Sequence, residues 1–83
     1  MSQSIVMGIG EIDIKKEILE APGNVMYAAK IRNSIVKKYG LVLDDHENQS
    51  MGKRIANCLS QMYDQGILGM YSDGAPIKYI RRR

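Results

Sequence analysis

Residues 50–83 read SMGKRIANCLSQMYDQGILGMYSDGAPIKYIRRR, and this stretch decides the fold. Its first half carries apolar residues at steps of three and four, which gather on one side of a helix with 3.6 residues per turn. These residues are Met51, Ile55, Cys58, Leu59 and Met62. The pattern predicts a helix capped by Ser50, with Asn48 as the alternative cap, and closed at Gly66. One face of this helix is therefore expected to be buried and the opposite face to be exposed.

The exposed face is expected to carry side chains that can hydrogen-bond to the edges of bases. Arg, Lys, Asn and Gln have the geometry for such contacts in the major groove of DNA. The candidate base-reading residues are Ser50, Lys53, Arg54, Asn57 and Gln61, with Arg54 at the edge of the face. Ordinary exposure to solvent is the competing explanation for these polar residues.

The second half of the stretch changes from helical spacing to strand-like apolar runs. Residues 67–71 precede an Asp73-Gly74 turn, and Ile77, Tyr79 and Ile80 follow it, which is a specific signal for a β-hairpin. Four cations lie on the returning strand and its end: Lys78, Arg81, Arg82 and Arg83. The sequence therefore predicts a basic hairpin directly after a helix with a polar face.

Two shorter helices are expected upstream. Residues 11–21 form the first, which Pro22 and Gly23 end, and residues 24–39 form the second, with Asn24 as its N-cap and Gly40 as its left-handed terminator. Leu41–Leu43 is expected to be a short strand or an apolar plug, and Asp44–Gln49 a polar loop.

The order helix, helix, helix, hairpin over residues 11–83 resembles winged helix-turn-helix domains. The resemblance implies an α+β fold that is mainly α, with residues 1–10 as an N-terminal arm. It implies that the third helix enters the major groove, that the second lies over the DNA backbone and that the hairpin forms the wing. The backbone and wing residues it implies are Lys37, Lys38, Ser72, Lys78, Arg81, Arg82 and Arg83. One departure is the nine residues between Gly40 and Ser50, where a tight helix-turn-helix uses three or four.

The positive charge is concentrated in the same half of the chain as the helix and hairpin. The net charge is +3. Residues 1–47 contain six Lys or Arg and seven Asp or Glu, whereas residues 48–83 contain six and two. A polyanion is therefore expected to be attracted to the third helix and the hairpin.

Enzyme and metal signatures are missing from the sequence. There is no phosphate loop, no HExxH and no nucleophile elbow, and the lone Cys58 lies on the apolar stripe. Asp44, Asp45, His46 and Glu47 stand in a row, but neighbouring side chains in an extended loop diverge, so an acidic surface turn is preferred to a metal site. We expect no reaction, no cofactor and no small-molecule substrate. No secretory signal and no apolar run of about 20 residues is present, which favours a cytoplasmic, nucleoid-associated protein without a membrane partner.

These observations predict a sequence-specific double-stranded DNA-binding protein. It would be a small regulator of transcription or replication from a bacterium, phage or plasmid. The alternative is a winged-helix module that docks a protein partner without touching DNA, since a fold alone does not settle function. Ile5–Ile9 is either a loosely packed arm or a strand through which two copies form a homodimer.

Overall fold

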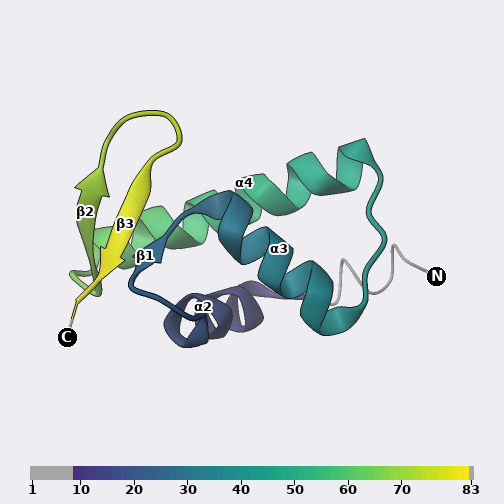
Figure 1. Cartoon of the computed structure of the whole chain (residues 1–83), viewed down its shortest axis with the longest axis horizontal. Coiled ribbons are helices and arrows are strands. Elements are labelled where there is room, and N and C mark those ends of the chain that lie inside the picture. Colours follow the sequence, from purple (N-terminus) through teal and green to yellow (C-terminus); the bar gives the residue numbers. More distant parts are fainter. Residues whose placement is uncertain (1–8, 83) are drawn as a thin grey trace.

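The computed structural model describes residues 9–82, which form a mainly helical α+β structure (Figure 1). This part of the chain contains three helices and one three-stranded antiparallel sheet. The elements are α2 (Glu11–Glu20), β1 (Val25–Met26), α3 (Ala28–Tyr39), α4 (Asp45–Asp64), β2 (Leu68–Ser72) and β3 (Lys78–Arg81). The predicted fold class, three helices followed by a hairpin, is confirmed at this level. Arg83 and the greater part of the Ile5–Ile9 segment lie outside the described residues.

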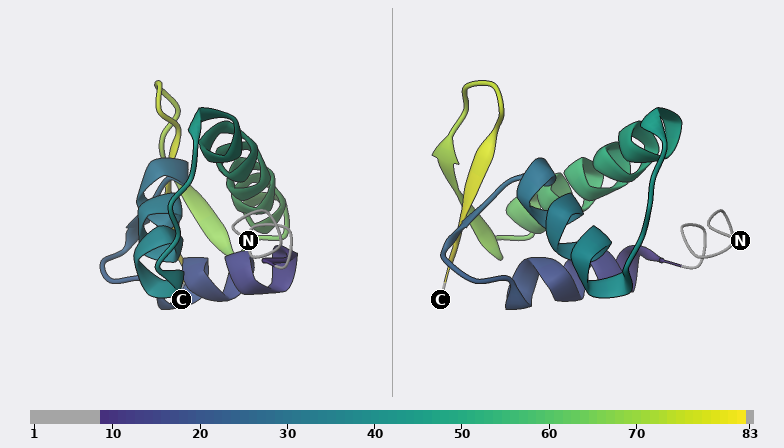
Figure 2. Two further views of the ribbon diagram at one scale, coloured as in Figure 1. Left: turned by 90° about the vertical axis from the view of Figure 1, so that its right-hand side faces the viewer. Right: turned by 45° about the vertical axis from the view of Figure 1, so that its right-hand side comes forward.

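The core lies between the three helices and the inner face of the sheet (Figure 2). All five residues of the predicted α4 stripe are buried, as are Ile14 and Ile18 of α2 and Ile31 and Ile35 of α3. Burial of such side chains supplies most of the stability of small domains. Leu19 of α2 and Tyr39 of α3 are apolar but about half exposed. Residues 41–43 form no strand, and the predicted apolar plug is confirmed in part: Leu41 is buried and Leu43 packs against the core, whereas Val42 is 85% exposed.

Helix α4 begins earlier than the sequence pattern predicts. Its N-cap is Asp44, whose carboxylate accepts a hydrogen bond from the Glu47 N–H at 2.8 Å. The Glu47 carboxylate in turn accepts from the Asp44 N–H at 3.1 Å, which completes a capping box. The predicted loop at Asp44–Gln49 and the predicted cap at Ser50 or Asn48 are therefore wrong. The connection from α3 to α4 shrinks to residues 40–44, close to the length of a tight helix-turn-helix.

Replacing Asp44 by alanine is expected to lower the free energy of unfolding by about 1 kcal/mol, because it removes the capping acceptor of α4. Urea denaturation followed by circular dichroism measures this change. Asp45→Ala is the matched control, since Asp45 interacts with the helix dipole without serving as the cap and should cost only a few tenths of a kcal/mol. Equal losses in the two variants would contradict the capping role.

The hairpin is confirmed, and a third strand joins it. Strands β2 and β3 pair antiparallel, with Met70 opposite Tyr79 and a bulge between Met70 and Ser72. Strand β1 pairs with the other edge of β3, so the strand order is β1-β3-β2. Asn24 was predicted to cap α3, but the cap is Tyr27, and the Asn24 carbonyl instead accepts from the Arg81 N–H at 2.8 Å. A strand of two residues is too short to leave a period-2 pattern, which explains why the sequence did not predict it.

Two glycines close the long helices as predicted. Gly40 follows α3 with φ 63° and Gly66 follows α4 with φ 80°, a conformation that side chains with a Cβ rarely adopt. Gly66 turns the chain directly from α4 into β2, which fixes the hairpin at the C-terminal end of the helix. None of the helices within residues 9–82 combines the length and the apolar character needed to cross a bilayer.

Candidate nucleic-acid interface

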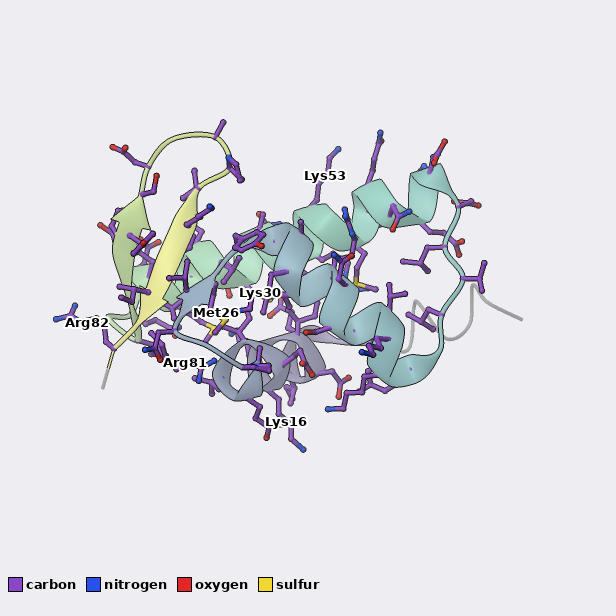
Figure 3. All side chains as sticks on the ribbon, in the orientation of Figure 1. Lys16, Met26, Lys30, Lys53, Arg81 and Arg82 are labelled. Atoms are coloured by element: carbon purple, nitrogen blue, oxygen red, sulfur yellow. The ribbon has the colours of Figure 1, made fainter. Side chains whose placement is uncertain are left out.

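The side of α4 opposite the core is a continuous polar face. Four of the five predicted base-reading residues lie on it and are exposed: Ser50, Lys53, Asn57 and Gln61. The earlier start of α4 adds His46 and Gln49, because residues spaced by three or four share a face. Figure 3 shows Lys53 pointing away from the body on the side to which the hairpin rises.

Arg54 does not belong to this face. Its guanidinium donates to the backbone carbonyl of Ile9, immediately before α2, and the residue is half buried. The contact therefore links α4 to the segment that precedes α2. Arg54 therefore has a structural role in this arrangement that its position at the edge of the helical stripe did not reveal.

An apolar groove runs between α4 and the hairpin. Its volume is about 200 Å³, and its lining comes from the first turn of α3, the middle of α4 and the returning arm of the hairpin. The lining residues are Ala28, Ala29, Ala56, Leu59, Pro76, Ile77 and Tyr79. The groove shows that these three elements meet at one surface, which adjoins the polar face of α4.

The N-terminal end of α3 opens onto this groove. In the described part of the chain no side chain accepts a hydrogen bond from the first-turn N–H groups of α3, and the first turn has no acidic residue. Such an end carries a partial positive charge and attracts anions. The Lys78 ammonium lies 5.3 Å from the centre of the Tyr27 ring, next to this helix end. Sequence reasoning missed this anion-attracting end because it placed the start of α3 at Asn24, where an Asn would have capped it.

Arg81, a predicted wing residue, points into the body. Its Nη2 donates to the carbonyl oxygens of Ile18 at 3.2 Å and Ala21 at 2.5 Å, and lies 3.8 Å from the Met26 sulfur. The two carbonyls belong to the last turn of α2 and its cap, where helices leave acceptors unsatisfied. Directly paired residues of an antiparallel sheet share a face, so Arg81 lies on the face of the buried Leu68. The prediction that Arg81 lies on the wing surface is not supported by this geometry.

The remaining predicted backbone cations are scattered over the molecule. Lys37 and Lys38 lie at the C-terminal end of α3, far from the hairpin in Figure 1, and Lys38 forms an ion pair with Glu17 at 3.4 Å. Arg82 is exposed and projects sideways from the base of the hairpin, away from its tip (Figure 3). Ser72 is exposed at the end of β2. Of the predicted cations within residues 9–82, only Lys53 and Lys78 lie beside the groove and the polar face of α4.

Two titratable groups lie in apolar or cationic surroundings. Burial raises the pKa of the Cys58 thiol, and the carboxylate of Glu11 acts in the same direction. Burial and the nearby Arg81 lower the pKa of Lys30, whose ammonium donates to the Val25 carbonyl at 2.7 Å. Cys58 therefore remains a protonated structural thiol, and Lys30 holds the end of β1.

Within residues 9–82 no group of three or more His, Cys, Asp or Glu side chains could hold a metal ion. The acidic run that includes His46 is divided between the cap and the first turn of α4. Comparison of the chain with family models, curated proteins and solved structures gives no match.

Proposed function

We propose that this protein binds double-stranded DNA as a winged helix-turn-helix domain, with α4 in the major groove. The observation that carries the proposal is the exposed polar face of α4 beside a projecting hairpin. A helix of 20 residues is about 30 Å long and about 10–12 Å wide. The major groove of B-form DNA is about 12 Å wide, so α4 is narrow enough to enter it.

The exposed residues of α4 differ in which groups of DNA they can bind. Gln49, Asn57 and Gln61 can each donate and accept on the edge of adenine, and Lys53 can donate to guanine. Asp64, near the end of the helix, is repelled by phosphate, so the last turn of α4 is expected to lie away from the DNA backbone. In this arrangement the residues from Gln49 to Gln61 select the sequence.

Backbone contacts in this proposal come from the groove between α4 and the hairpin. The first-turn N–H groups of α3 and the Lys78 ammonium would hold phosphate oxygens there. Lys37, Lys38 and Arg81 are left out, because the first two lie at the distant end of α3 and Arg81 caps α2. The electrostatic part of the affinity therefore depends on few cations.

The small number of cations at this surface predicts that the DNA-binding affinity depends only weakly on salt concentration. With two to three phosphates neutralised, the logarithm of the association constant should fall with the logarithm of salt concentration at a slope of about −2 to −3. Fluorescence anisotropy with mixed-sequence duplex DNA at several salt concentrations measures the slope. A slope of about −6 or steeper would show that the scattered cations also bind DNA, and absence of binding at low salt would contradict the proposal.

Sequence selection is tested separately with Asn57→Ala. The variant should bind random duplex as tightly as the wild type, yet lose about tenfold in affinity for a selected target site, as expected for one bidentate base contact. Asn33→Ala makes the same substitution at an exposed residue of α3, outside the polar face of α4, and is the control. In this proposal the protein regulates by occupying DNA and catalyses no reaction of its own.

A second candidate function is docking of a protein partner. The hairpin exposes apolar side chains beyond the core: Ile67, Met70, Tyr71 and Ile77. Apolar surface of this kind is typical of protein interfaces when it is contiguous. Binding that withstands high salt would distinguish this function from DNA binding.

A further inference from the structure

The apolar groove meets the exposed surface of α4 at Ala56. This residue is exposed and lines the groove together with the buried Leu59 and with Ile77 of the hairpin, which is 49% exposed. Lys53 precedes Ala56 by three residues and Ser60 follows it by four, so both lie on its side of the helix. An apolar methyl group therefore borders the polar face of α4.

The two margins of the groove differ in chemistry. At the α4 margin, the exposed Lys53 and Ser60 can hydrogen-bond to the edges of bases. At the other margin lies the first turn of α3, which has neither an acidic residue nor a side-chain cap in the described part of the chain. The Lys78 ammonium stands beside this turn, 5.3 Å from the centre of the Tyr27 ring. The groove is thus an apolar strip between hydrogen-bonding side chains and an edge that attracts anions.

A thymine nucleotide presents the same three kinds of group in the same order on the major-groove side of DNA. The O4 acceptor lies toward the middle of the major groove, the C5-methyl group lies nearer to the backbone of its own strand, and the phosphate lies beyond it. Adenine, guanine and cytosine carry no methyl group there. Thymine therefore matches the groove in polarity and in charge, with its methyl group opposite the apolar strip.

We propose that the groove binds the C5-methyl group of a thymine in the target site, between Ala56 of α4 and Ile77 of the hairpin. This inference rests on the proposed function, because it requires α4 to lie in the major groove. Alanine is one of the residues that contact the thymine methyl group in protein–DNA complexes. Removal of one methyl group from water corresponds to about a fourfold gain in affinity.

The size of the groove fits a methyl group together with the sugar that carries the base. Its volume of about 200 Å³ is several times the roughly 30 Å³ of one water molecule, which is similar in size to a methyl group. The deoxyribose of the same nucleotide lies between the base and the phosphate, and its carbon atoms occupy the remaining space. Ala28 and Ala29 line the α3 end of the groove, and their small side chains leave the way to the phosphate open.

Ala56 is then a residue that determines specificity. Its methyl group distinguishes thymine from the other three bases by an apolar contact, whereas Asn57 and its polar neighbours distinguish bases by hydrogen bonds. The selected site is therefore expected to contain a thymine beside the base pair that Asn57 contacts. Glycine at position 56 removes the apolar partner and should abolish the preference for the methyl group.

Replacement of single thymines by uracil tests the proposal. A duplex is selected with the wild-type protein from a pool of random sequence, and each thymine is then replaced in turn by uracil, which lacks only the C5-methyl group. At one position or more the affinity measured by fluorescence anisotropy should fall about fourfold. 5-Bromouracil at the same position should restore the affinity, because bromine is apolar and close to a methyl group in size.

Ala56→Gly identifies the protein side of the contact. In this variant the thymine and uracil duplexes should differ by less than about twofold in affinity. The ratio of two affinities within one variant cancels any effect of glycine on folding, and circular dichroism verifies that the variant is folded. Asn57→Ala is the matched control, because it weakens binding to the selected duplex but leaves Ala56 in place and should retain the fourfold ratio.

The possible failures are distinguishable. If the protein binds no duplex, the proposed function is contradicted and this inference with it. If a selected duplex is bound but no replacement of thymine changes the affinity, or 5-bromouracil does not restore it, the inference alone is overturned and DNA binding stands. A loss that persists unchanged in Ala56→Gly would show that uracil acts through the shape of the duplex, and would overturn the role of Ala56.

Discussion

Replacing Arg81 by alanine is expected to lower the free energy of unfolding by about 2–4 kcal/mol. The side chain bonds two carbonyls at the C-terminal end of α2 from the last residue of β3, and hydrogen bonds to a charged group contribute about 1.5–3 kcal/mol. Its stem also packs against the body, so truncation removes apolar contacts. A chain of this size has about 4–12 kcal/mol of stability in total. The loss should appear as a decrease in Tm of about 10 °C or more.

Arg82→Ala is the matched control for this prediction. Arg82 is the next residue, carries the same charge and is exposed, so its removal should change stability by less than about 0.5 kcal/mol. Arg81→Met retains most of the apolar stem and measures the contribution of the guanidinium alone. Thermal and urea unfolding of the three variants provide the measurement. If Arg81→Ala and Arg82→Ala were equally stable, the contact between β3 and the end of α2 would not contribute to folding.

Arg81 also shows where prediction from sequence reaches its limit. A cation near the end of a basic strand is most simply assigned to the surface, and its partners are backbone carbonyls about sixty residues earlier in the chain. No local pattern encodes such a contact. The prediction that Arg54 reads bases failed for the same reason. The Ile9 carbonyl that accepts its hydrogen bond belongs to a segment that is distant in the sequence. The sequence shows which positions carry Lys or Arg, but it does not show which of these side chains face solvent.

The elements that repeat locally were predicted well. The stripe of α4 recurs over several turns, and every member is buried. The Asp-Gly turn defined the hairpin, and Gly40 and Gly66 defined the helix ends. The start of α4 was missed although the sequence contains its signal, since Asp44 and Glu47 are spaced as in a capping box. Six consecutive polar residues, Asp44–Gln49, favoured a loop only because the reciprocal cap was not considered.

Reversing the charge of Lys53 is expected to weaken DNA binding about ten- to thirtyfold. Lys53→Glu removes a cation from the polar face of α4 and places a carboxylate against phosphate or the acceptors of the major groove. Such a change in affinity corresponds to about 1.4–2 kcal/mol. The loss should be larger at low salt, because the added repulsion is screened as the ionic strength rises. Anisotropy titrations at two salt concentrations measure both effects.

Lys16→Glu is the control that distinguishes the effect of the position of the reversed charge from the effect of the change in net charge. Lys16 is an exposed lysine on α2, on the opposite side of the molecule from Lys53 in Figure 3, and both variants have the same net charge. If α4 is the DNA-binding face, Lys16→Glu should change the affinity by less than about threefold at physiological salt, where the Debye length of about 8 Å is short compared with the molecule. Equal losses would mean that net charge alone drives the association. A larger loss for Lys16→Glu would move the DNA to α2, because only a face in direct contact with phosphate responds to a single reversed charge under screening.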